Sequence, residues 1–468
     1  MKFLLARDLD EYISGGKLKH LSRGFRIGRQ TRYTSTILID RLTNGSLRPR
    51  RADIALLTYD SFRHYHLDGG WFNIFQDPLR HFAARSGLTV ETLEILNAFP
   101  PRRPAFARVF SVSVDTVMAN IVARMGFAPT LTDRELRDLN RAIERALEEV
   151  GVTAADGFFV RLNSALRTLF TLARLFERHL ASIGPRQIWM ANYYSVSGMA
   201  MCLAGSRSGI PTVDISHGSS GNLHYAYSGF DGHPSGGYPI LPSYFLSRHE
   251  GDAKALDSLV RNSSSHHPPI VVGDLAAHAW RDDAFGIASE TRRKLELATR
   301  GAPVKKDKLD VLIAAQSIER LPNQVVEAMH AARGWCRFWI RFHPIYLRDI
   351  GDFNPPDGIE IPDLMATTTA PLFSLLERID VVLTESSSVA EDGLYWDRPA
   401  VIVHPFGQNM FKEYIDEGRM LAASTSREIA EALSSIHLGT WRPVSGTASG
   451  TASADGQKAR LMEFLNAI

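Results

Sequence analysis

A histidine surrounded by small polar residues follows a short apolar run in the middle of the sequence. The run TVDI predicts a buried strand, and it leads directly into the loop SHGSSG at 216–221. Gly218 lets the backbone approach a ligand closely, and the exposed amides of Ser219 and Ser220 suit an anionic group. His217 could act as a general base or donate a hydrogen bond to a phosphate. Alternatively, His217 satisfies a buried hydrogen bond at a turn.

A second ionisable pair closes another predicted strand, residues 337–342. Arg341 and His343 lie two residues apart, so they share a face if the strand continues, and Pro344 follows them. A histidine fixed by a following proline can hydrogen-bond a phosphate or a ribose. A structural strand end, with the histidine capping a backbone group, is the alternative.

Three consecutive hydroxyl residues follow a third predicted strand, residues 381–384. Ser386, Ser387 and Ser388 precede a predicted helix that contains Glu391. Hydroxyls and free amides at a helix start bind anions, and Glu391 could accept hydrogen bonds from a ribose. Plain N-capping by a serine, with Glu391 facing the helix dipole, is the alternative.

The loop after the first predicted strand, residues 53–59, is also rich in ionisable side chains, including Asp60, His64 and Asp68. Ligands of open α/β folds bind at the carboxyl ends of strands, so this loop is a candidate wall of the site. The Asp-x-Asp triplet at 8–10 does not follow a strand, so no metal site is predicted.

Strands and helices must alternate to bring these loops together. The sequence predicts a doubly wound α/β fold with two Rossmann-like domains facing each other across a cleft. Further strands are predicted at 187–191, 269–272, 309–315 and 400–403, and helices at 132–150, 162–183, 196–206, 290–300, 323–333, 371–378 and 388–395.

The expected domain boundaries follow from breaks in this alternation. Residues 1–275 form an acceptor-binding domain with a basic arm at 1–50, and 276–305 form a linker. Residues 306–440 form the nucleotide-binding domain, and 441–468 are a flexible segment with a final helix at 457–467. The stretch 222–265, rich in Gly, Pro, Ser and His, is expected to be a long loop or linker.

Composition excludes several classes of protein. The 468 residues include 53 Lys and Arg against 51 Asp and Glu, a balance that argues against a nucleic-acid-binding protein. Two cysteines cannot form a paired-cysteine zinc site and fit the reducing cytoplasm. No apolar run is long enough to span a membrane, although the basic arm could contact a membrane surface.

Taken together, the motifs resemble those of GT-B glycosyltransferases. The resemblance rests on the motifs His-Gly at 217–218, Arg-x-His-Pro at 341–344 and Glu-Ser-Ser-Ser at 385–388. More narrowly, they resemble capsule Kdo transferases, bacterial polysialyltransferases and teichoic-acid glycerophosphotransferases. The resemblance covers about residues 185–410, and no motif of these families is recognisable before residue 180.

The resemblance implies that His343, Ser386, Ser387 and Ser388 bind the nucleotide of a cytidine-linked donor. The acidic motif that provides the base in polysialyltransferases lies early in their chains, whereas here an acidic Glu-Asp-Gly follows the serines, at 391–393. The base therefore stays open among His217, Asp60, Asp68 and other first-domain acids.

The expected function is a metal-independent glycosyltransferase that uses no cofactor. It would move a sugar from a CMP- or CDP-linked donor to a bacterial surface glycan or lipid-linked acceptor, in the cytoplasm or peripheral to the inner membrane. A nucleotide-sugar 2-epimerase, suggested by Val272-Gly273-Asp274, and a non-catalytic sugar-nucleotide-binding scaffold are the alternatives.

Overall fold

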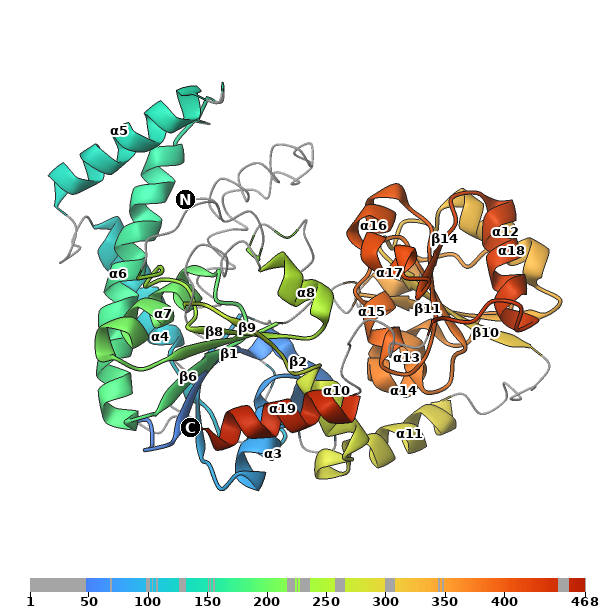
Figure 1. Ribbon diagram of the computed structural model, residues 1–468, viewed down its shortest axis with the longest axis horizontal. Helices are drawn as coiled ribbons and strands as arrows, with labels where there is room; N and C mark the ends of the chain where they lie inside the picture. The colour runs from blue at the N-terminus through green and yellow to red at the C-terminus, as the bar shows by residue number, and fades with distance from the viewer. Residues whose placement is uncertain are drawn as a thin grey trace.

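The computed structural model shows two α/β domains side by side (Figure 1). It describes residues 48–67, 70–97, 102, 104–106, 108–125, 132–149, 151, 153–154, 156–216, 224, 226–227, 236–256, 266–298, 308–343, 346, 349–444 and 454–467.

The first domain is built on a parallel sheet. Its strands are almost entirely buried, as expected where helices cover both faces of a parallel sheet. In the described residues the sheet has seven strands, ordered β5 (Phe110–Ser111), β4 (Val90–Ile95), β1 (Ile54–Tyr59), β6 (Gln187–Met190), β7 (Thr212–Ile215), β8 (Tyr244–Ser247) and β9 (Pro269–Val271).

Two hydrophobic cores fill the space between this sheet and its helices. One core lies against α4 (Ser113–Arg124), α6 (Phe158–Ile183) and α7 (Val196–Ser208). The other lies against α3 (Gln76–Arg85), α10 (Leu275–Arg281) and α19 (Ala454–Asn466). Helix α19 follows the second domain in sequence but packs on the first, beside α3 and α10 (Figure 1).

Helix α5 (Asp133–Glu149) projects from the first domain (Figure 1). The predicted capping box is confirmed, because the Glu135 amide donates to Thr132 Oγ1 at 3.2 Å and the Thr132 amide donates to Glu135 Oε2 at 2.7 Å. Among the described residues, no helix is long and apolar enough to cross a membrane.

The second domain has a smaller parallel sheet. Hydrophobic residues pack on both faces of this sheet. Helices α12 (Asn323–Ala332) and α18 (Ser426–His437) cover one face, and the opposite face lies toward the first domain. Its five described strands are ordered β11 (Cys336–Phe342), β10 (Leu309–Ala315), β12 (Val381–Thr384), β13 (Ala400–Ile402) and β14 (Met420–Ala422). The remaining helices are α13 (Leu364–Thr369), α14 (Leu372–Leu376), α15 (Val389–Leu394), α16 (Pro405–Met410) and α17 (Lys412–Asp416).

The described part of the expected linker, residues 276–298, is largely helical and packed. Helix α10 runs to Arg281, and α11 (Ile287–Ala298) follows after one 3-10 turn. Trp280 and Ile287 are buried in the same core as Trp339 of the second sheet. The two domains therefore share hydrophobic contacts as well as a chain crossing.

Six of the described strands were not predicted. Residues 222–265, expected as a loop, contain β8 and helix α8 (Glu250–Ala255) in their described part. Strands β4, β5 and β14 were also missed, as were β2 (Arg63–Leu67) and β3 (Gly70–Asn73) in the loop expected after the first strand. The final helix is confirmed as α19, whereas residues 445–453 of the expected flexible segment and residues 1–47 of the basic arm lie outside the described residues.

Candidate functional site between the domains

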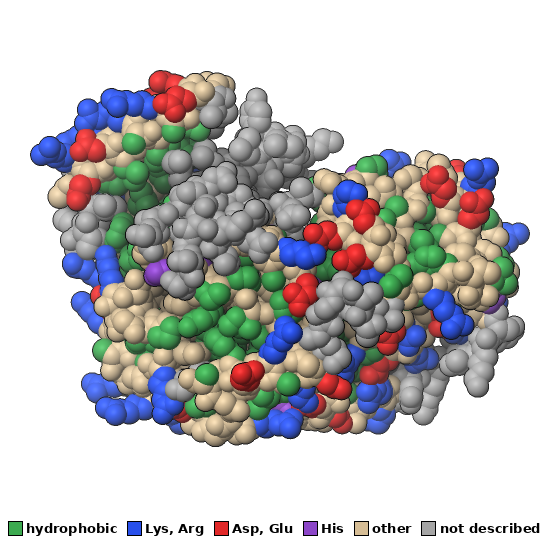
Figure 2. Space-filling view, in the orientation of Figure 1, with side chains coloured by type: hydrophobic (Ala, Val, Ile, Leu, Met, Phe, Trp, Pro, Cys, Tyr) green, Lys and Arg blue, Asp and Glu red, His purple; other side chains and the backbone are tan. Residues whose placement is uncertain are grey.

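The carboxyl ends of the two sheets face each other across a cavity of about 360 Å³. Residues at the ends of β7, β8 and β9 line it from the first domain, and residues at the ends of β10, β11 and β12 line it from the second. Charged side chains of both signs gather along the seam between the domains (Figure 2). Ligands of open α/β sheets bind at such strand ends, so this cavity is the candidate site.

Arg341 and His343 both line the cavity. The Arg341 guanidinium is buried, and its Nη1 donates to the carbonyl oxygens of Thr367 at 2.8 Å and Ala370 at 2.7 Å. These bonds fix the position of the guanidinium and of its positive charge. Partial burial, and then the charge of Arg341, lower the pKa of His343, so its imidazole is neutral at neutral pH.

The serine turn, residues 385–388, reaches the cavity through Ser387 and Ser388. The Ser387 amide donates to Thr384 Oγ1 at 3.2 Å, and Ser387 Oγ accepts from the Val389 amide at 3.3 Å. Ser388 precedes α15 without capping it through its side chain. Ser386 is not among the lining residues, so the structure separates it from its two neighbours.

The acid expected to face the ribose lies elsewhere. Glu391 is buried, with 2% of its surface exposed, and does not line the cavity. Asp392, the next residue of α15, does line it. The described cavity lining thus includes Asp392 and not the predicted Glu391.

On the first-domain side, His64 projects from a hairpin of β2 (Arg63–Leu67) and β3 (Gly70–Asn73). Burial lowers the pKa of His64 to about 3, helped by the charges of Arg102, His343 and Arg341. Its imidazole is therefore neutral at neutral pH. The sequence marked this loop as a site wall but did not single out His64.

The other predicted residues of the first domain lie apart from the cavity or outside the described part. Asp60 is completely buried, and its Oδ1 accepts from the Asn97 amide at 2.6 Å, so the structure places it in the domain interior and not on the lining. Ser216 does line the cavity. His217, Gly218, Ser219, Ser220, Asp68 and Pro344 lie outside the described residues.

Sequence reasoning missed an ion-pair cluster on the cavity lining. Arg248, which directly follows β8, is buried and pairs through Nε with Asp274 Oδ2 at 3.0 Å and through Nη2 with Asp392. All three side chains line the cavity, and Asp392 belongs to the second domain. Recognition of β8 would have marked Arg248 as a strand-end residue.

Tyr395 of the second domain adds a neutral connection to the same cluster. Its hydroxyl accepts a hydrogen bond from the Asp274 amide at 2.7 Å and donates one to the Arg248 carbonyl at 2.9 Å. One side chain thereby joins the ends of β8 and β9 to the second domain. Within the described residues, no group of three or more His, Cys, Asp or Glu side chains is arranged to hold a metal ion.

No family model and no curated protein matches this sequence. Among solved structures, UDP-GlcNAc 2-epimerase from Neisseria meningitidis bound to UDP-GlcNAc matches with a TM-score of 0.51 and 11% identity over 88% of this chain and 98% of that chain. UDP-GlcNAc 2-epimerase from Methanocaldococcus jannaschii in complex with UDP-GlcNAc and UDP matches with a TM-score of 0.46 and 10% identity over 88% and 99%. The kitacinnamycin glycotransferase matches with a TM-score of 0.45 and 12% identity over 89% and 96%.

At such low identity the likeness establishes the fold alone. The chain has two Rossmann-like α/β domains facing each other across a cleft, the GT-B-like arrangement.

Proposed function

We propose that this protein is a glycosyltransferase that binds a nucleotide sugar in the cavity between its domains. The observation that carries the proposal is the convergence of Arg341, His343, Ser387 and Ser388 from one domain with His64 from the other. The first four suit a phosphate, and the fifth suits an acceptor hydroxyl.

The proposed donor is linked to a cytidine nucleotide, CMP or CDP. The motif resemblance supports this choice, since it assigns His343, Ser387 and Ser388 to the nucleotide of such a donor. Arg341, whose guanidinium donates to the carbonyl oxygens of Thr367 and Ala370, lines the same cavity and suits a phosphate.

In the proposed reaction, an acceptor hydroxyl attacks the anomeric carbon of the donor sugar. The bond from that carbon to the phosphate oxygen breaks, and the nucleotide leaves with the bonding electrons. His64 takes the proton of the hydroxyl. Arg341 and the hydroxyls of Ser387 and Ser388 stabilise the charge that develops on the leaving phosphate.

The proposed acceptor is a bacterial surface glycan or a lipid-linked sugar, and the proposed location is the cytoplasm, including the inner membrane surface. The motif resemblance supports the acceptor class. The basic sequence at 1–50 supports membrane contact.

A nucleotide panel tests the donor site. Binding to the native state raises the melting temperature, so CMP or CDP is expected to shift it more than UDP, GDP or ADP. Ser387→Ala should reduce the shift, and Ser386→Ala is the matched control because Ser386 does not line the cavity. The absence of a shift with all five nucleotides would contradict the proposed site.

A nucleotide-sugar 2-epimerase is the second candidate, favoured by the match to the Neisseria meningitidis epimerase. The two described acids on the lining, Asp274 and Asp392, are both engaged by Arg248, which leaves few free groups for epimerisation chemistry. Conversion of UDP-GlcNAc to its 2-epimer without an acceptor would establish this candidate. Nucleotide binding without turnover of any kind would instead support the scaffold.

A further inference from the structure

We propose that the buried carboxylate of Glu94 positions His64 for the transfer reaction by holding Arg63, the neighbour of His64 in the hairpin. This inference rests on the proposed function, in which His64 accepts a proton. Glu94 does not line the cavity, so it would act through the hairpin and not on the substrate.

The hairpin has an irregular register at His64. Arg63 pairs with Asn73 and Tyr65 pairs with Phe72, so two steps along β2 correspond to one along β3. His64 is the extra residue of this β-bulge. Bulges re-aim side chains and are frequent next to active sites, and here the bulged residue is the one that reaches the cavity.

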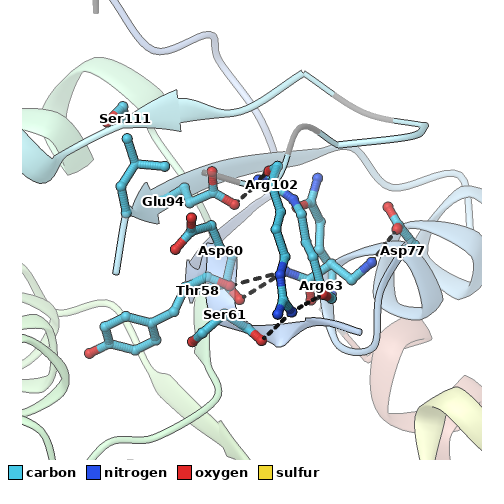
Figure 3. A network of polar contacts seen from close by, with 12 residues as sticks. Thr58, Asp60, Ser61, Arg63, Asp77, Glu94, Arg102 and Ser111 are labelled. Atoms are coloured by element: carbon cyan, nitrogen blue, oxygen red, sulfur yellow. Dashed lines mark hydrogen bonds and ion pairs between the residues drawn. The ribbon is translucent and has the colours of Figure 1, made fainter. Parts of the chain in front are cut away.

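The residue before the bulge is held by a buried ion pair. Arg63 and Glu94 are each only 1% exposed, and Arg63 Nη2 donates to Glu94 Oε1 (Figure 3). Glu94 lies on β4 beside Thr58 of β1 in the register of the sheet, so its backbone is part of the rigid domain core. Arg102 adds a second connection, because its Nη1 donates to the Arg63 carbonyl.

The residue that faces Arg63 across the hairpin is fixed as well. Asn73 Oδ1 accepts from the amides of Phe75 at 2.9 Å and Gln76 at 3.0 Å. The backbone amide of Asn73 donates to Asp77 Oδ2 at 2.8 Å. Asn73 is thus attached to the start of α3, and both residues that pair before the bulge are held by buried polar groups.

The chemistry of the pair also favours a positioning role. A buried ion pair is weak evidence for stability, since burying its charges costs about as much as their attraction returns. Its geometric effect is definite, because a charged guanidinium with a buried partner can adopt few positions. A shift of about 1 Å in a reacting group costs up to ~100-fold in rate.

The first experiment is a double-mutant cycle in a sugar-transfer assay. Glu94→Gln keeps the shape and removes the charge, and we expect kcat to fall ~10- to 100-fold while the KM for the donor stays within about twofold. In a His64→Ala background, Glu94→Gln should have almost no further effect, because Glu94 acts only through His64. Equal losses in both backgrounds would overturn the inference.

A matched control is available on the same strand. Glu91 is also buried, but its Oε1 accepts from the Arg50 amide at 3.1 Å, and it lies three residues before Glu94, beside Ala55 of β1. Glu91→Gln should leave kcat unchanged, and a loss as large as that of Glu94→Gln would show a general effect of buried charge on this strand and overturn the inference.

A second variant keeps the test decisive if Glu94→Gln does not fold. Asn73→Ser retains a side-chain oxygen that can cap α3 but removes the amide group directed at Thr58 Oγ1 and the Tyr59 carbonyl. The same loss of kcat, coupled to His64, is expected; an additive loss overturns the inference. The nucleotide panel and the transfer assay of the wild-type protein test the proposed function separately from this inference. If the wild-type protein transfers no sugar, the proposed function itself fails.

Discussion

Removal of the Tyr395 hydroxyl should weaken the contact between the domains. Tyr395→Phe leaves the Asp274 amide and the Arg248 carbonyl without the partner that now bonds both, at 2.7 and 2.9 Å. A buried polar group left unpaired costs ~1–3 kcal/mol, so the two groups together should cost about 2–4 kcal/mol, allowing for partial rearrangement. In a domain of about 200 residues this corresponds to a melting temperature ~4–16 °C lower.

The protein offers a close control for this substitution. Tyr414 is also buried and also packs its ring against His249, at a centroid distance of 6.2 Å compared with 5.1 Å for Tyr395. Its hydroxyl, however, has no hydrogen-bond partner among the described residues. Tyr414→Phe should therefore change the free energy of unfolding by less than about 0.5 kcal/mol or increase it.

Urea unfolding monitored by tryptophan fluorescence, and thermal unfolding monitored by calorimetry, would measure the stability of both variants. Because two-domain proteins often unfold in more than one step, the comparison should use the midpoint of each transition. Equal destabilisation by the two substitutions would refute the reasoning, since it would show that the hydrogen bonds of Tyr395 carry no particular weight.

Three further predictions concern single residues. Burial raises the pKa of Asp77 to about 7, so the folded state keeps a proton that the unfolded chain releases near pH 4. The stability of the protein should therefore fall as the pH rises between these two values. Asp77→Asn should flatten this decline in melting curves recorded over the pH range, and an unchanged slope would contradict the prediction. A Cβ at Gly407 would overlap the Glu385 carbonyl oxygen, so Gly407→Ala should displace the serine turn, cost ~1–3 kcal/mol and weaken the shift by CMP or CDP, whereas Gly334→Ala, with open space around it, should not. Because the pKa of His64 is about 3, protonation of His64 should not lower kcat/KM near pH 6.5. A pH–rate profile from pH 5 to 8 checks this, and a fall in kcat/KM toward acidic pH that disappears in His64→Gln would contradict it.

Apolar runs predicted most of the fold. Strands such as β7 and β12 are short, apolar and bounded by polar loops, and the structure places them where the sequence did. Strand β4 was missed because VETLEI carries Glu91 and Glu94 inside a buried element. Their burial is possible because Arg50 and Arg63, 41 and 31 residues away, provide hydrogen-bond donors that no local pattern reveals.

The candidate site could be predicted only in part for a similar reason. Arg341 lies at the end of a predicted strand, His343, Ser387 and Ser388 follow predicted strands, and strand ends in a parallel sheet converge. The choice between Glu391 and the adjacent Asp392 depends on the rotation of α15 about its axis, which a six-residue helix leaves open in the sequence.

Because α19 follows the second domain in sequence but packs on the first, the first domain can complete its core only after α19 has been synthesised. Leu461 and Leu465 are completely buried in the core formed by β1, α3 and α10, and Phe464 packs on Trp189 at a ring distance of 5.8 Å. Translation of the second domain, at ~5–20 residues per second, separates these residues from α10 by on the order of ten seconds. During that interval the first domain lacks one wall of its core, so a nascent chain should stay dependent on chaperones until α19 emerges.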